Sequence, residues 1–203
     1  MDPFLRQLAE LCQAEKTRVK WVFVRSYAIG HTLGERLVVA GCDWANIRFT
    51  TPLDVALQMA APFLVERRLE PAIDTLGPAL VMRLLAELPD ETPAYFRGLD
   101  DTPRMAEALW RTLRELRMAG LRSTDLRGEA FASSAKHAAL RAIVQACEAF
   151  LEQARFADVA AVYDEALRHL DVCPVLPGDM WIVLPGVIWA PLEQAFLAAL
   201  PGT

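Results

Sequence analysis

The acidic residues that could serve as general acids or bases are paired in one turn-rich stretch of the chain. Asp90-Glu91 and Asp100-Asp101 both fall within residues 87–104, between two helical patterns. Carboxylates act as general acids and bases only where the fold holds them at the reacting atoms. In a stretch this rich in turn residues, helix capping and solvation explain the two pairs better than catalysis does. The same stretch is the best internal boundary of the chain.

A phosphate-binding loop of the Walker type is missing from the sequence. Such a loop needs a glycine-rich turn followed by lysine and then serine or threonine, so that backbone N–H groups can cradle the phosphates. Gly30 is the first glycine, and no glycine in the chain is followed by lysine. Lys16-Thr17 has the last two residues of the motif, but no glycine loop precedes it. The sequence therefore predicts no nucleotide binding of this kind.

Signatures of nucleases, hydrolases and zinc sites are also missing. A PD-(D/E)xK nuclease core needs an acidic residue two positions before a lysine, whereas Pro89-Asp90 is followed by no lysine until Lys136. Neither GxSxG nor HExxH occurs. The cysteines and histidines are dispersed along the chain, at Cys12, Cys42, Cys147, Cys173, His31, His137 and His169. We predict reduced thiols, no metal site, no cofactor and no catalytic residue, and no motif supports an enzyme of unrelated chemistry.

Three arginines are spaced along one face of a helical pattern. Arg111, Arg114 and Arg117 lie at positions i, i+3 and i+6, and the arginine fork suits phosphate groups. Glu107 and Glu115 lie close by in the sequence, so a solvated face with salt bridges is the simpler explanation. Contact with nucleic-acid phosphates is the alternative.

Composition limits the classes of function. The 203 residues are 54% hydrophobic and 23% charged, which is ordinary for a protein with a buried core. A net charge of -5 provides no overall attraction to nucleic acid, so such contact would need a local patch. The N-terminal Met-Asp-Pro does not begin a signal peptide, and the apolar runs are too short to cross a bilayer. We therefore expect a cytoplasmic protein without membrane contact.

Strand and helix patterns alternate at the start of the chain. In order, they are a helix at 2–16, a strand at 19–26, a helix at 29–41, a strand at 45–51 and a helix at 52–67. The first strand is a continuous apolar run, which is typical of a fully buried parallel strand. Gly41 is expected to end the helix at 29–41. This alternation of strands and helices is typical of βαβ units.

Helical periodicity then dominates for about a hundred residues. The helical patterns are at 71–88, 102–120, 133–154 and 156–170, and a strand returns only at Trp181–Leu184. Pro191 then opens a last helix. We predict an α/β fold with a parallel sheet flanked by helices and a large all-helical insertion. The expected divisions are 1–68 and 171–203 for the α/β core and 69–170 for the insertion.

Two early segments resemble conserved parts of UvrD-like superfamily 1 helicases. The first resembles motif Ia, a strand that leads into a Thr/Ser-rich turn and a helix ending in Glu-Arg-Leu; it reads VFVRSYAIGHTLGERLVVAG. Ser26 stands in place of the second threonine of that turn and Tyr27 in place of its asparagine. The next segment, ANIRFTTPLDVALQMA, resembles the strand and Thr-Phe-His-Ser turn that follow in the family. Thr51 and Ala56 match, while Pro52 replaces the aromatic residue.

The last segment, WIVLPGVIWAPLEQAFLAAL, resembles motif II of the same family, a strand ending in Asp-Glu-x-x-Asp-x-x-Pro-Leu-Gln. Pro191-Leu192 match this pattern. Leu184 and Pro185 fall on the two acidic positions, and Ile188 falls on the later aspartate. In active relatives these acids hold Mg²⁺ and position the attacking water. The apolar replacements make these positions easier to bury, since no unpaired carboxylate is desolvated.

The resemblance implies a P-loop-helicase-like fold that has lost ATP hydrolysis, as in the inactivated N-terminal domain of AddB-type helicase–nuclease subunits. It implies a DNA repair or recombination context, with an active helicase subunit of AddA type as partner. It also implies that Ser26 and Thr51 lie where active helicases touch single-stranded DNA. Both residues are also good helix caps, and capping alone is the simpler explanation. The alternative function is a protein-binding scaffold without nucleic-acid contact. We expect either further chain or a partner at the open edge of the sheet.

Overall fold

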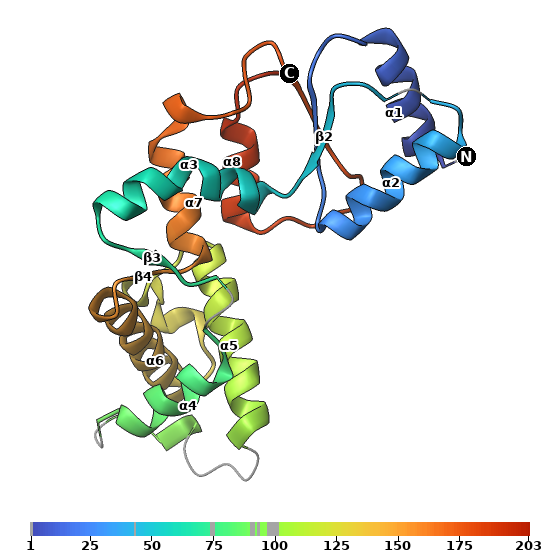
Figure 1. The fold of residues 1–203 in the computed structure, drawn as a ribbon. Coiled ribbons are helices and arrows are strands. Elements are labelled where there is room, and N and C mark those ends of the chain that lie inside the picture. Colours follow the sequence, from blue (N-terminus) through green and yellow to red (C-terminus); the bar gives the residue numbers. More distant parts are fainter. Residues whose placement is uncertain (1, 43, 74–75, 90–91, 93, 97–101) are drawn as a thin grey trace. The chain divides into compact units, whose positions relative to one another are not determined.

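The computed structural model describes residues 2–42, 44–73, 76–89, 92, 94–96 and 102–203 (Figure 1). It has a mixed α/β fold in which a small parallel sheet is flanked by helices. The chain divides into two compact units. Unit 1 comprises Met1–Ala61, Glu165–Trp189 and Glu193–Thr203, and unit 2 comprises Pro62–Asp164 and Ala190–Leu192. The boundaries predicted from the sequence, at 68 and 170, lie a few residues later.

The sheet of unit 1 has three parallel strands in the order β2-β1-β5. The strands are β1 (Lys20–Phe23), β2 (Ile47–Thr50) and β5 (Met180–Val183). Lys20 lies opposite both Ile47 and Met180. Every residue of the central strand β1 is buried, as its continuous apolar pattern predicts. Thr203 runs along the outer side of β5, where its N–H bonds to Asp179 O and its carbonyl accepts from Trp181 N, both at 3.2 Å.

Helices α1 (Pro3–Ala14) and α2 (Tyr27–Val39) bury apolar side chains with β1. The α1 helix begins at the predicted place because the Asp2 carboxylate accepts from Phe4 N at 2.9 Å. The α2 helix ends as predicted at Gly41, whose φ of 71° is left-handed. Gly41 N bonds to Val38 O there, and Cys42 N bonds to Leu37 O. Helices α3 (Pro52–Glu66) and α8 (Pro191–Ala199) lie partly in unit 1: α3 belongs to it as far as Ala61, and α8 belongs to it from Glu193 on.

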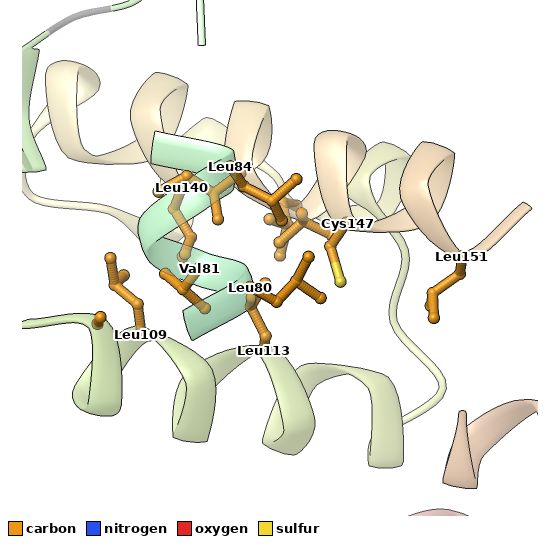
Figure 2. Packing of buried hydrophobic residues seen from close by; sticks show 12 residues of the cluster. Leu80, Val81, Leu84, Leu109, Leu113, Leu140, Cys147 and Leu151 are labelled. Atoms are coloured by element: carbon orange, nitrogen blue, oxygen red, sulfur yellow. The ribbon is translucent and has the colours of Figure 1, made fainter. Parts of the chain in front are cut away.

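Unit 2 is built around three packed helices, α4 (Pro78–Glu87), α5 (Thr102–Met118) and α6 (Ser134–Gln153). Figure 2 shows leucine and valine side chains from these helices meeting in one apolar core. Leu113 and Val144 are almost completely buried in it. The α5 helix ends at Gly120, with a φ of 74°, by the same arrangement as α2. Single helical turns at Ala94–Phe96, Ser123–Asp125 and Gly128–Ala130 complete this unit, and a fourth at Leu170–Val172 belongs to unit 1.

The expectation of an all-helical insertion is wrong in one respect. Strands β3 (Glu70–Pro71) and β4 (Phe156–Ala157) pair in parallel inside it. The helix predicted at 156–170 accordingly begins only with α7 (Val159–Arg168), because Asp158 caps it and the residues before it are extended. The helix predicted at 71–88 begins only at Pro78, since Gly77 is extended and Pro78 suits the first helical turn. Short strands of two residues leave too little periodicity to detect.

The turn-rich stretch 87–104 is described only in part. Its carboxylate pairs, Asp90-Glu91 and Asp100-Asp101, lie outside the described residues. Within the described part of the chain, no helix is both long enough and apolar enough to span a bilayer.

Candidate nucleic-acid interface

The predicted contact residues of unit 1 lie at the carboxyl edge of the sheet. Because the three strands are parallel, their C-terminal ends meet at one edge, which is where ligands bind in open α/β sheets. Arg25 and Ser26 follow β1, Thr51 follows β2, and Leu184 follows β5. The edge therefore carries one cation, two hydroxyl groups and an apolar loop.

Ser26 occupies the N-cap position of α2 but does not cap it with its side chain. Its backbone is extended, with φ -156° and ψ 156°, and its hydroxyl bonds to none of the first helical N–H groups. The side chain is exposed. Ser26 therefore places a hydroxyl group in solvent beside the positive end of a helix dipole, an arrangement that suits an anion.

Thr51 is engaged in capping α3. Its N–H donates to the Asp54 carboxylate at 3.2 Å, and its hydroxyl donates to the same carboxylate. In return, Asp54 N donates to Thr51 Oγ1 at 3.2 Å. This reciprocal arrangement is a capping box, so the capping alternative accounts for Thr51.

Asp54 also affects Tyr27 at the start of α2. The hydrogen bond between the Tyr27 hydroxyl and the Asp54 carboxylate raises the pKa of Tyr27, with burial and the negative charge of Asp54 adding to the effect. Asp54 thus places a negative charge at the start of α3, where it would repel a phosphate. We conclude that the two strand ends differ: the end of β2 is occupied by Asp54, and the end of β1 is open at Ser26.

Arg25 is a residue of this edge that the sequence analysis missed. Its guanidinium donates to Ile188 O, lies 5.2 Å from the centre of the Trp189 ring, and approaches the Glu193 carboxylate at 3.8 Å. These contacts fasten the loop after β5 to the end of β1. The available signal was a cation directly after a buried apolar strand, where a side chain reaches the neighbouring strand end.

The three positions that resemble a lost motif II differ in burial. Leu184 is half-buried and packs against the core beneath α1 and α2. Pro185 is exposed, and Ile188 is 83% exposed. Of these positions, which their apolar side chains make easier to bury, Pro185 and Ile188 are exposed on either side of Gly186, which has a left-handed φ of 74°.

The arginine stripe belongs to unit 2 and is not uniform. Arg111 is exposed and lies 3.6 Å from the Glu107 carboxylate. Arg114 is exposed, and it has no ion pair among the described residues. Arg117 forms two hydrogen bonds with Asp158, at 2.8 and 3.0 Å, and both side chains are mostly buried. The pKa of Arg117 is raised above its usual value. Burial lowers it, but the hydrogen bonds to Asp158 and the nearby negative charges raise it by more.

The predicted contact residues are divided between the two units. Ser26 and Thr51 lie in unit 1, and the arginines lie in unit 2. Of the arginines, Arg114 is the most available to a phosphate, since Arg117 is held by Asp158.

The thiols are mainly buried. Cys12, Cys42 and Cys147 are buried, and Cys173 is half-buried. Burial raises the pKa of Cys12 and of Cys147 to about 11, helped by the neighbouring Cys42 and Asp158 respectively. Within the described ranges, no three histidine, cysteine or acidic side chains come together as metal ligands do.

No protein-family model matches this sequence, and no curated protein is significantly similar to it.

Proposed function

We propose that the chain is a non-catalytic pseudo-helicase domain that handles DNA or supports assembly in a bacterial repair or recombination helicase–nuclease. In this proposal the sheet is a P-loop-helicase-like core, and the protein works in the cytoplasm beside an active helicase subunit of AddA type. The resemblance of three segments to UvrD-like helicases is its starting point.

The observation that carries the proposal is the arrangement of these three segments. The strands at 20–23, 47–50 and 180–183 are adjacent and parallel in one sheet, although unit 2 separates the last from the others in sequence. Adjacent parallel strands are common to βαβ folds, so this arrangement is compatible with the proposed core. Their C-terminal ends meet at the edge where the resemblance places both DNA contact and the lost acidic residues.

The chemistry of this edge favours holding phosphate over hydrolysing it. Leu184, Pro185 and Ile188 supply no side-chain oxygen ligands for Mg²⁺. Ser26 instead presents a hydroxyl group at the start of α2, and hydroxyl groups and helix N-termini are common contacts to nucleic-acid backbones. The role we assign is therefore sequence-independent contact with single-stranded DNA.

A salt-dependent titration tests this role. Fluorescein-labelled oligothymidine is titrated with the protein at low and at physiological salt, and the affinity is expected to fall steeply as salt rises because bound phosphates release counterions. Ser26→Asp should weaken binding, since it places a negative charge where a phosphate would lie. Ser133→Asp is the matched control: Ser133 caps α6 through Lys136 N at 3.2 Å, and aspartate is an equally good cap.

Two results would count against the proposal. Absence of binding at low salt would remove the DNA role and leave the protein-binding scaffold. ATP hydrolysis by the purified chain in the presence of single-stranded DNA would show that the domain is not a pseudo-enzyme.

The scaffold is a second candidate because one part of unit 1 exposes apolar side chains. Val38 and Val39 on α2 are 62% and 88% exposed. Large apolar side chains gathered on one element indicate a surface for a partner.

A further inference from the structure

An apolar groove lies between helix α2 and edge strand β2. We call it the α2–β2 groove and define it by Gly30, Gly34, Val38, Trp44, Ile47 and Phe49, which all line it. Its volume is ≈ 720 Å³, and all of its residues belong to unit 1. The groove is thus wide enough to accept several side chains.

Two glycines set the shape of the groove. A Cβ atom on Gly30 would lie 2.7 Å from Phe49 Cβ, so only glycine lets α2 approach β2 this closely. Gly34, one turn later, faces the Trp44 and Phe49 rings, whose centroids are 5.9 Å apart in an edge-to-face pair. The floor is therefore formed by backbone and aromatic rings, with the exposed Val38 at the rim.

The strand beside the groove has unused backbone groups. In the parallel pairing with β1, Lys20 N bonds to Asn46 O and Val24 N bonds to Thr50 O. Because alternate residues of a strand face opposite neighbours, Ile47 and Phe49 direct their N–H and C=O groups away from β1. Neither residue has another backbone partner in the described part of the chain. The open edge can therefore accept one more strand.

Charge differs between the two faces of this edge. On the groove side, Glu35 is the acidic lining residue, and it is exposed and forms no ion pair with the described residues. On the opposite face, Arg48 lies over the Trp21 ring at 4.8 Å. On the groove side, an added strand that complements Glu35 carries a lysine or arginine among its apolar side chains.

A second copy of this chain fits the edge poorly. If two β2 strands paired antiparallel and used both Ile47 and Phe49, residue 48 would lie on the two-fold axis. Arg48 would then stand directly opposite Arg48 of the second copy, and like charges in directly opposite positions destabilise a strand pair. A partner of different sequence does not meet this repulsion.

We propose that the α2–β2 groove docks an extended segment of another protein, which adds to β2 as a strand with its apolar side chains in the groove and a basic side chain beside Glu35. This inference rests on the assembly part of the proposed function and needs no DNA contact. The binding mode is strand addition, in which backbone bonds provide affinity and side-chain pockets provide specificity.

A random-peptide phage library selected on the immobilised full chain supplies the probe. Enriched peptides are expected to alternate apolar residues and to contain lysine or arginine. A labelled peptide from this set is then titrated by fluorescence polarisation. In the complex, hydrogen exchange at the Ile47 and Phe49 amides should slow, because both N–H groups become bonded.

Two pairs of variants make the test specific. Val38→Asp and Glu35→Lys should each weaken peptide binding at least about tenfold. Val65→Asp on α3 and Glu10→Lys on α1 are the matched controls, since Val65 is 74% exposed, Glu10 is also exposed, and neither lines the groove. Both controls should bind as the wild type does.

Three outcomes would overturn the inference: no enrichment over a blank surface, binding that Val38→Asp leaves unchanged, or a dimer in sedimentation equilibrium that Val38→Asp dissociates. The last outcome would assign the groove to self-association. Because the oligothymidine titration uses a different ligand, loss of DNA binding does not affect this result, and loss of peptide binding does not affect the DNA result.

Discussion

Arg117, near the end of α5, donates two hydrogen bonds of 2.8 and 3.0 Å to Asp158, the residue just before α7. The two residues lie far apart in sequence. The same carboxylate accepts from Ala161 N at 2.9 Å and so begins α7. The pair therefore connects the end of one helix to the start of another within unit 2. It also removes Arg117 from the set of arginines that could meet DNA.

Arg117→Ala is expected to lower the free energy of unfolding by about 3 kcal/mol, because it leaves Asp158 as a mostly buried carboxylate without its partner. Arg114→Ala on the same helix is the control and should change stability by less than about 0.5 kcal/mol, since Arg114 is exposed. Urea denaturation followed by circular dichroism measures both. Equal effects would mean that the ion pair contributes nothing to stability.

Helix capping should distinguish Thr51 from Ser26 in stability. Thr51→Ala should destabilise the protein by about 1 kcal/mol, because it removes the hydroxyl from the capping box with Asp54. Ser26→Ala should cost less than about 0.5 kcal/mol, because the Ser26 hydroxyl forms no capping bond. The midpoints of urea denaturation distinguish the two. A larger loss for Ser26→Ala would indicate a structural role for Ser26 that the geometry does not show.

The two glycines of α2 should respond to alanine with opposite signs. Gly30→Ala brings Cβ to 2.7 Å from Phe49 Cβ and is expected to destabilise the protein by about 1 to 3 kcal/mol through overpacking. Gly34→Ala brings Cβ to 3.4 Å from the Trp44 ring, which is an ordinary contact, so the higher helix propensity of alanine should stabilise by about 0.5 to 1 kcal/mol. Thermal unfolding of both variants is the measurement, and a shift in the same direction would contradict the described packing.

Buried thiols should make stability depend on pH in the alkaline range. The pKa of Cys12 and of Cys147 rises from 9.0 to about 11 on folding, chiefly because burial disfavours the thiolate. Between these values the unfolded chain releases protons that the folded chain retains, so stability falls as pH rises from 9 to about 11. Below pH 9 this contribution is fully present.

The double variant Cys12→Ala/Cys147→Ala checks this directly. It should be less stable overall, because small cavities remain, yet its urea midpoint should vary less with pH over the alkaline range than that of the wild type. An identical pH dependence in the two proteins would show that other groups cause it.

Local patterns predicted most of the elements correctly. The apolar run around β1 and the glycines at 41 and 120 correspond to a buried strand and to two helix ends in the structure. These features depend on residues close together in sequence, which is why single-sequence patterns detect them. Strands β3 and β4 escaped detection, since each has two residues and exists only because the other lies beside it.

The candidate contact residues show the same division. Residue type made Ser26, Thr51 and the three arginines look alike as phosphate ligands. Their partners in the structure separate them. Asp54, only three residues along the chain, engages Thr51, and the distant Asp158 engages Arg117, whereas Ser26 and Arg114 stay open. Arg25 was overlooked because its contacts to Ile188, Trp189 and Glu193 come from residues more than a hundred positions away.

The order of strands and helices, the caps and the lack of acidic residues after β5 are properties of the sequence, because each rests on residue type and short-range spacing. Which polar groups are occupied, that Ile188 faces solvent, and that β2 keeps an open edge beside an apolar groove depend on the folded chain. Such properties arise largely from contacts between residues that are distant in sequence, and local sequence patterns do not specify these contacts.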